Sequence, residues 1–265
     1  MTDQEKIDIA LGALRAWQNE DWDAVADAFT EDGVLEAAGG KPVVGRAAIR
    51  KVLDLMAVGL EHQDLQLLRV GVVDGKVVEQ RKDVVVINGA TGEIPTVGVL
   101  TIADGKIARW TDYVDRIMLR EHKLAPAIPD PWPGYADGTE SDEEKIAVAL
   151  DMITAWEAQD WDRAASLFAE HGVLQSVMLE PIVGREAFRS RLEPMHEGLE
   201  RMELHIKSVG VIEGAVVLER VDEFDMLGNH CELPVAGVLR IANGEVFEWL
   251  EYYDRRTMLK GMGAL

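Results

Sequence analysis

The sequence has a single cysteine, Cys231, among 265 residues. One thiol cannot form a disulfide within the chain, so we expect a protein of a reducing compartment and predict a cytoplasmic location. No apolar run approaches the roughly 18 residues that a membrane-spanning helix needs. The polar N-terminal residues do not resemble a signal peptide. The sequence therefore predicts no membrane partner.

Basic residues are scarce. The chain has 27 lysines and arginines against 48 aspartates and glutamates, which gives a formal net charge of −21. Nucleic acids are bound through clusters of basic side chains, so we predict no nucleic-acid partner. The six histidines have no spacing typical of a metal site. We therefore also predict no bound metal.

An internal repeat covers nearly the whole chain. The tripeptide at residues 5–7 recurs at residues 144–146, an offset of 139 residues (144 − 5). The offset then holds without a gap as far as Tyr113, which corresponds to Tyr252. A period this long indicates duplicated domains, because solenoid repeats are much shorter.

The repeat divides the chain into three predicted parts. Residues 1–121 form a first domain and residues 141–265 a second, while residues 122–140 form a linker rich in proline and glycine. Each domain begins with helical patterns, and in the first copy the β-rich segments that follow are about 64–73, 76–88, 93–103 and 106–118. Helices followed by an antiparallel meander predict an α+β fold, in which a curved sheet closed by helices forms a cone with a pocket.

Charged residues lie on predicted strands that are otherwise apolar. Arg81 and Asp83 are two positions apart in the first copy, so they share one face of a strand. A charged pair that faces a core is costly unless its charges are matched. A second acid on a neighbouring strand, Asp112, provides that match. The corresponding residues of the second copy are Arg220, Asp222 and Glu251.

Two carboxyls that share one buried arginine do not titrate alike. The arginine favours ionisation, whereas burial and mutual repulsion oppose it, so the pair is expected to hold one proton near neutral pH. Such a pair contains a general acid and a general base at once. The sequence therefore predicts acid/base catalysis that needs no cofactor.

These motifs resemble those of the limonene-1,2-epoxide hydrolase family. The resemblance rests on Arg-x-Asp after an apolar strand, on residues 93–99 with their second copy at 232–238, and on Trp110 and Trp249, each two residues before an acid. The family belongs to the NTF2-like and SnoaL-like superfamily. The resemblance implies two tandem NTF2-like (cystatin-like) cones, each a curved, mostly antiparallel sheet with N-terminal helices, packed as an internal pseudo-dimer that can form a further homodimer.

The resemblance also implies roles for the charged residues. In this family one acid acts as base on a water, another protonates the epoxide oxygen, and an arginine bridges them. By position the base is Asp112, the acid is Asp83 and the bridge is Arg81. The corresponding base, acid and bridge of the second copy are Glu251, Asp222 and Arg220.

The sequence departs from the family pattern at the residues that hold the water. Where the family has a tyrosine and an asparagine, the first copy has Leu35 and Ala37, and the second has Leu174 and Ser176. An acid/base pair without a held water also suits a lyase or an isomerase/cyclase. Glu251 is one methylene longer than aspartate, and shifts of about 1 Å can cost on the order of a hundredfold in rate. We therefore expect the second copy to be weaker, differently selective or purely structural.

Four further residues carry separate expectations. Asp115 and Asp254 have the wrong strand parity to join the acids, and we predict that they lie at the surface or at strand ends. His205 and His230 lie on second-copy strands and are candidates for the pocket.

The sequence as a whole favours an epoxide hydrolase that acts on a small apolar substrate. Two alternatives stay open: a lyase or isomerase/cyclase with the same acid/base pair, and a non-catalytic protein that binds a small molecule.

Overall fold

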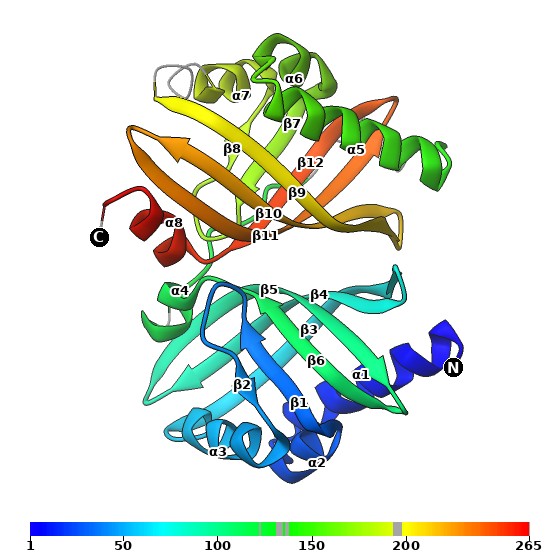
Figure 1. The fold of residues 1–265 in the computed structure, drawn as a ribbon, viewed down its shortest axis with the longest axis vertical. Coiled ribbons are helices and arrows are strands. Elements are labelled where there is room, and N and C mark those ends of the chain that lie inside the picture. Colours follow the sequence, from blue (N-terminus) through cyan, green and yellow to red (C-terminus); the bar gives the residue numbers. More distant parts are fainter. Residues whose placement is uncertain (122, 131–134, 136–137, 193–197, 265) are drawn as a thin grey trace. The chain divides into compact units, whose positions relative to one another are not determined.

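The computed structural model describes residues 1–121, 123–130, 135, 138–192 and 198–264. The chain forms two compact units, Met1–Ala125 and Pro126–Leu265. Each unit contains helices and one six-stranded sheet, and the two units repeat the same order of elements (Figure 1). The predicted α+β fold with two tandem copies is confirmed.

The first unit begins with two helices, continues with a short strand pair and a third helix, and then forms a long meander. Its elements are α1 (Asp3–Gln18), α2 (Trp22–Asp27), β1 (Phe29–Ala37), β2 (Val43–Val44), α3 (Arg46–Met56), β3 (Leu60–Val73), β4 (Lys76–Ile87), β5 (Ala90–Ala103), β6 (Lys106–Tyr113) and α4 (Arg116–Glu121).

The second unit repeats this order. Its elements are α5 (Asp142–Glu157), α6 (Trp161–Leu167), β7 (Phe168–Ser176), β8 (Ile182–Val183), α7 (Arg185–Leu192), β9 (Leu199–Ile212), β10 (Ala215–Met226), β11 (Asn229–Ala242), β12 (Glu245–Tyr253) and α8 (Arg255–Gly261).

The sheets are mostly antiparallel, with one parallel contact in each. The strand order is β2-β1-β6-β5-β4-β3 in the first unit and β8-β7-β12-β11-β10-β9 in the second. The first strand of each unit pairs in parallel with the last, β1 with β6 and β7 with β12. The first and last strands of the sequence repeat therefore lie side by side, although about 70 residues separate them.

Helices cover one face of each sheet, and tryptophans fill the space between. Ser141 caps α5 through a capping box with Glu144. In the core of the second unit, the ring centroid of Trp156 on α5 lies 5.5 Å from that of Trp249 on β12. In the first unit, Trp110 is fully buried and its ring lies 5.5 Å from that of Trp17. The tryptophans thus join the first helix of each unit to its last strand.

The last strand of the first unit is shorter than predicted, and in both units a helix follows the end of this strand. The segment expected to be β-rich over 106–118 is a strand only to Tyr113, and α4 begins at Arg116. Asp115 and Asp254 follow directly after the ends of β6 and β12, as the strand-end alternative predicted, but they are 2% and 1% exposed, so the surface alternative is wrong. Asp254 caps α8 by accepting hydrogen bonds from the backbone N–H and the hydroxyl of Thr257. Asp115 accepts a hydrogen bond from the backbone N–H of Ile117, and such bonds at the first turn of a helix offset the cost of burying a carboxylate.

Part of the segment predicted as a linker packs on the second unit. Tyr135 stacks on Phe247 with ring centroids 5.3 Å apart, and Glu140 accepts a hydrogen bond from the backbone N–H of Gly244. Residues 122, 131–134 and 136–137 of this segment lie outside the described residues. Within the described ranges, no helix is both long and apolar enough to cross a membrane.

Replacing Asp254 tests whether this cap supports the second unit. We expect Asp254→Ala to lower the free energy of unfolding by at least about 1 kcal/mol, because the first turn of α8 loses its acceptor. Asp254→Asn keeps an acceptor that caps helices about as well and is expected to recover much of that loss. Chemical denaturation of the full chain measures both variants. Equal losses for Ala and Asn would contradict the capping role.

Candidate active site

In the first unit, Arg81 lies at the centre of a cluster of carboxylates. It extends from β4 and is 4% exposed. Its Nε lies 2.9 Å from Oδ1 of Asp83, and its Nη2 lies 2.9 Å from Oδ2 of Asp112. The three residues singled out from the sequence are therefore in direct contact.

The sheet register explains how Arg81 reaches Asp112, which lies two strands away. Gly98 of β5 pairs with Glu79 of β4 on one side and with Asp112 of β6 on the other. A Cβ atom added at Gly98 would lie 3.0 Å from Nη1 of Arg81, closer than side chains ordinarily pack. A glycine at this position therefore leaves room for the guanidinium group to pass from β4 to β6.

A third carboxylate, Glu79, belongs to this cluster and was not predicted. It is 0% exposed, and its Oε1 accepts a close hydrogen bond from Nη1 of Arg81. Its Oε2 is buried and has no hydrogen-bond partner among the described residues. Alternate residues of a strand share a face, so the spacing of Glu79 and Arg81 carried this signal in the sequence.

Two of the acids around Arg81, Glu79 and Asp83, hold their protons more tightly than ordinary carboxyls. Burial raises the pKa of Glu79 to about 8 and that of Asp83 to about 6, while the charge of Arg81 opposes both shifts. Repulsion from Asp112 adds to both increases. At neutral pH the cluster therefore retains a proton, and Glu79 is the residue that holds it.

The second unit repeats the arrangement with one carboxylate fewer. Nε of Arg220 lies 2.7 Å from Oδ1 of Asp222, and its Nη2 lies 2.6 Å from Oε2 of Glu251. Leu218 replaces the third carboxylate, and Nη1 of Arg220 has no hydrogen-bond partner among the described residues. A Cβ atom added at Gly237 would lie 2.8 Å from that Nη1 and 3.0 Å from Oε1 of Glu251.

A tryptophan fixes the second oxygen of one acid in each unit. The indole Nε1 of Trp110 donates to Oδ1 of Asp112 at 2.8 Å. The indole Nε1 of Trp249 likewise donates to Oε1 of Glu251. Each of these acids thus receives the arginine and an indole N–H, which holds its orientation. The Trp-x-acid spacing was visible in the sequence, but this contact was not predicted from it.

The acids of the second unit are also poorly solvated. Burial raises the pKa of Asp222 and of Glu251, and the positive charge of Arg220 opposes part of each shift. Burial alone would lower the pKa of Arg220, but the two carboxylates outweigh it and raise that pKa. Arg220 therefore stays charged, and the pair of acids is the part of the site that exchanges a proton.

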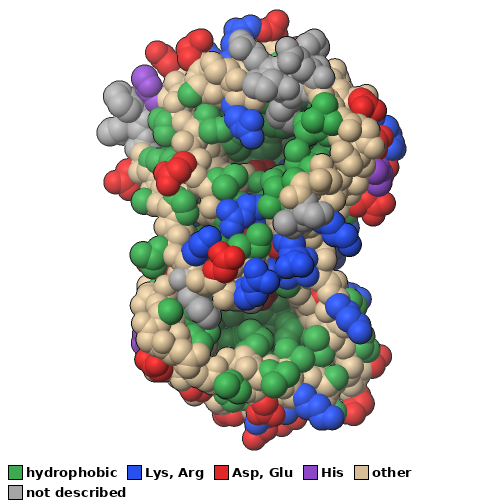
Figure 2. Space-filling model, turned by 90° about the vertical axis from the view of Figure 1, so that its left-hand side faces the viewer, with side chains coloured by type: hydrophobic (Ala, Val, Ile, Leu, Met, Phe, Trp, Pro, Cys, Tyr) green, Lys and Arg blue, Asp and Glu red, His purple; other side chains and the backbone are tan. Residues whose placement is uncertain are grey.

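A cavity of about 570 Å³ opens onto Arg220, Asp222 and Glu251. This volume falls within the range of small-molecule sites, roughly 300–1,000 Å³. Most of its wall is apolar and comes from the sheet, from α5, and from α8 with its C-cap, which contribute Met258 and Met262. Hollows lined mainly by hydrophobic side chains are visible in each unit (Figure 2). The acids of the second unit therefore face a cavity suited to an apolar ligand.

Two hydroxyl groups in this cavity were not recognised from the sequence as part of the site. The hydroxyl of Tyr253 donates a hydrogen bond to Oγ of Ser176 at 2.9 Å, and both residues line the cavity together with Glu251. Ser176 occupies one of the positions where the resemblance implied a water-holding residue, whereas Tyr253 lies on a different strand. Only the pairing of β7 with β12 brings the two together.

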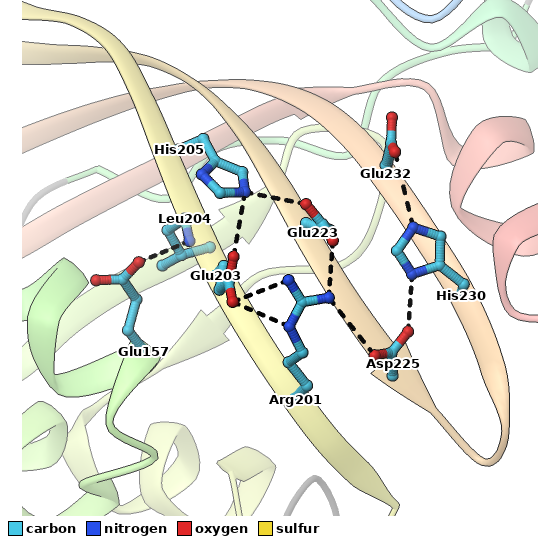
Figure 3. Close-up of polar contacts among 9 residues, drawn as sticks. All are labelled: Glu157, Arg201, Glu203, Leu204, His205, Glu223, Asp225, His230 and Glu232. Carbon is cyan, nitrogen blue, oxygen red and sulfur yellow. Dashed lines mark hydrogen bonds and ion pairs between the residues drawn. The ribbon is translucent and has the colours of Figure 1, made fainter.

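The two histidines considered for the pocket lie on an exposed ion-pair network instead. His205 lies 3.0 Å from Glu223, and Arg201 bridges Glu223 and Glu203 (Figure 3). Neither His205 nor His230 lines the cavity. Glu203, His205 and Glu223 are the one group of donor atoms, in the described part of the chain, close enough to hold a metal ion. Arg201 already forms ion pairs with both carboxylates, so this group belongs to a surface ion-pair network.

Together, the fold and the paired acids define a class of small α+β domains in which a buried arginine contacts two acids, which in the second unit line an apolar pocket. The sequence pattern of the limonene-1,2-epoxide hydrolase catalytic domain matches residues 143–263, and that of the SnoaL-like domain matches residues 11–110. The epoxide hydrolase EphG of Mycobacterium tuberculosis is 33% identical over 104 residues, which cover 38% of this chain and 68% of that protein. The chain belongs to the limonene-1,2-epoxide hydrolase-like family, within the NTF2-like and SnoaL-like superfamily.

Solved structures similar to this chain align with about half of it. An LEH-like epoxide hydrolase of M. tuberculosis is 24% identical with a TM-score of 0.42, covering 45% of this chain and 90% of that one. A putative polyketide cyclase of Xanthomonas campestris pv. campestris is 20% identical with a TM-score of 0.42, covering 45% of this chain and 97% of that one.

Replacing Glu79 tests the proton held in the first unit. Below about pH 4.5 Glu79 is protonated in both the folded and the unfolded chain. Between about 4.5 and 8 only the unfolded chain releases the proton, so the wild-type protein loses stability as the pH rises. Glu79→Gln has no carboxyl proton to lose. Relative to wild type, we therefore expect the variant to gain stability between pH 4.5 and pH 8, by at most about 1.4 kcal/mol for each unit by which folding raises the pKa of Glu79.

Denaturant unfolding of wild type and Glu79→Gln at both pH values measures this difference. Glu79→Leu reproduces the second unit, which has Leu218 at this position, and is expected to show the same dependence on pH. A difference between variant and wild type that stays constant across the pH range would show that Glu79 is not the buried proton carrier.

Proposed function

We propose that the protein is an epoxide hydrolase for a small apolar substrate and that its second unit carries out the reaction. The observation that supports this most directly is the contact of one buried arginine, Arg220, with two acids of the cavity, Asp222 and Glu251. The match of residues 143–263 to the limonene-1,2-epoxide hydrolase catalytic domain favours the same unit. This assignment differs from the sequence expectation that the second copy is weaker.

In the proposed reaction, one acid of the pair accepts a proton and the other donates one. Glu251, ionised, takes a proton from a water molecule, and the water oxygen attacks an epoxide carbon. The carbon–oxygen bond of the ring breaks, and Asp222, protonated, gives its proton to the epoxide oxygen. The product is a diol. The proton on Glu251 then returns to Asp222 through solvent, which restores the starting state.

The environment of the pair supports this division of labour. In water two carboxyls would both ionise well below neutral pH. Burial raises the pKa of both acids, so one proton remains on the pair, while Arg220 stabilises the negative charge of the other. The apolar wall excludes bulk water and strengthens these interactions. No chemical group beyond water and these side chains is required by the proposed step.

A second candidate function concerns the first unit. Its arginine and acids are in contact in the same way, but Ala37 and Val114 stand at the positions of the two cavity hydroxyls of the second unit. In the first unit Glu79 adds a third carboxyl group, whose raised pKa keeps it protonated at neutral pH. A site with an added acid and without these hydroxyls favours proton transfer within a substrate, as in a lyase or isomerase. The match of residues 11–110 to the SnoaL-like domain is compatible with such an activity.

Substitution of the acids tests the assignment to the second unit. We expect Asp222→Asn and Glu251→Gln each to lower kcat for epoxide opening by about 100-fold or more, since general acid and base each contribute roughly that much. Asp112→Asn is the matched variant of the first unit and measures that unit's share of turnover. Hydrolysis that fell with Asp112→Asn but not with Glu251→Gln would place the reaction in the first unit. Binding of an epoxide with no turnover would favour a binding protein.

Isotopic labelling separates hydrolysis from isomerisation. In ¹⁸O-labelled water, a hydrolase incorporates one labelled oxygen into each diol. An isomerase or lyase that works by proton transfer releases product without label from solvent water. Wild type and Glu251→Gln are compared with the same epoxide. An unlabelled rearranged product that forms at wild-type rate would contradict the proposed hydrolysis.

The pH profile gives an independent test of the acid/base pair. Activity rises with pH as Glu251 ionises and falls as Asp222 loses its proton, so we expect a bell-shaped dependence of kcat/KM. Because burial raises both pKa values, the optimum should lie above the range of ordinary carboxyls. The two apparent pKa values belong to the coupled pair. A profile that is flat from pH 4 to 9 would exclude this pair as the acid and base.

A further inference from the structure

A cluster of ionisable side chains lies on the face of the second sheet that is turned away from the cavity. Leu204 and Asp222 line the cavity. Glu203, His205 and Glu223 alternate with them along β9 and β10, so they face the other side of the sheet. Glu203 and Glu223 are direct register partners across the two strands. The cluster is therefore separate from the acid/base pair and has its own surroundings.

Two carboxylates of this cluster divide their oxygens between an arginine and a histidine (Figure 3). Arg201 donates to Oε1 of Glu203 at 2.9 Å and to Oε1 of Glu223 at 2.8 Å. The other oxygen of each carboxylate faces His205, whose Nε2 lies 3.0 Å from Oε2 of Glu223 and 3.6 Å from Oε2 of Glu203. Three donor atoms, one from each residue, therefore converge on one point, while Arg201 holds the far oxygens of both carboxylates.

The spacing of these donor atoms fits a transition-metal ion. Zn²⁺ binds imidazole nitrogen and carboxylate oxygen at about 2.0–2.2 Å, so the donor atoms of a tetrahedral site lie about 3.4 Å apart. The two distances from Nε2 of His205 lie on either side of this value, and the donor atoms of all three residues lie within 4.8 Å of one another. Hydrogen bonds from Arg201 to the far oxygens are the kind of outer contact that orients carboxylate ligands.

The charge of the surrounding surface also favours a cation. One arginine, Arg201, lies among four carboxylates, which gives a net charge of −3 (1 − 4) when the histidines are neutral; the carboxylates are those of Glu203, Glu223, Asp225 and Glu232. Like charges at this spacing repel one another, and a divalent cation reduces that repulsion. Arg201 alone therefore leaves the cluster with surplus negative charge.

The fold itself does not require these residues. The first unit forms the same sheet with Asp64, Gln66 and Val84 at the corresponding positions, so it has one carboxylate and no imidazole there. The cluster is thus a feature of the second unit alone. The spacing of the histidines in the sequence gave no indication of it, because two of the three donors are glutamates and one comes from a different strand.

We propose that Glu203, His205 and Glu223 bind one divalent transition-metal ion and that Zn²⁺ is the ion this donor set fits. His205 binds through Nε2 as a neutral imidazole that keeps its proton on Nδ1. Three protein ligands leave the fourth position for water. The ion joins β9, the edge strand of its sheet, to β10. Because it lies on the face opposite the cavity, it stabilises the strand pair and takes no part in the proposed hydrolysis.

Titration of the full chain with Zn²⁺, in a preparation without a polyhistidine tag, tests the site. We expect calorimetry at neutral pH to show one Zn²⁺ bound per chain. His205→Ala and Glu203→Gln should each weaken the affinity by about tenfold or more, because each removes one of three ligands. His230→Ala is the matched control and should change the affinity by no more than about twofold. His230 belongs to the same exposed network, through Asp225 and Glu232, but not to the donor group.

Stability provides a second readout of the same variants. Zn²⁺ should raise the midpoint of chemical denaturation of wild type and of His230→Ala, but not of His205→Ala, since only an intact site binds the ion in the folded state. A wild type that binds no Zn²⁺, or a His205→Ala variant that binds it as wild type does, would overturn the proposal and leave a surface ion-pair network only. Equal losses in His205→Ala and His230→Ala would also overturn it, because the ion would then be held by other residues of the network.

Discussion

The site of each unit depends on one arginine that is buried together with the acids that neutralise it. Removing a charge from water costs several kcal/mol, and an attraction at short range repays that cost only when the geometry is good. Asp222 lies on the same strand as Arg220, whereas Glu251 lies two strands away, and Arg220 reaches it because the strand between them has a glycine at the crossing point, Gly237. The register of three strands and the absence of one side chain therefore determine where a proton can be shared.

The two copies of the fold contain different sites. In the first unit, Glu79 brings a third acid to Arg81, and the surplus negative charge retains a proton within the cluster. In the second unit, Leu218 removes that acid, and a hydroxyl pair stands in the cavity instead. The two sites therefore differ in the number of acids around the arginine and in the polar groups beside them.

The sequence was sufficient for features that depend on local spacing and insufficient for those that depend on strand pairing. The alternation of side chains along a strand predicted that Arg81 and Asp83 share one face, and the same rule would have placed Glu79 on that face. The parallel pairing of β7 with β12 is not visible in either strand alone, so the meeting of Ser176 with Tyr253 was missed. The burial of Asp254 was missed because the end of the strand and the start of α8 were not recognised. How the two units pack on each other stays a prediction.

The apolar wall of the second cavity affects both the acids and the water that can reach them. Burial against this wall raises the pKa of Asp222 and of Glu251, so the pair binds a proton more tightly than carboxyls in water do. The same wall restricts water, because in an apolar cavity a water stays only where polar groups hold it. The few polar side chains of the wall therefore matter for both effects, and they lie on neighbouring strands, β7, β10 and β12.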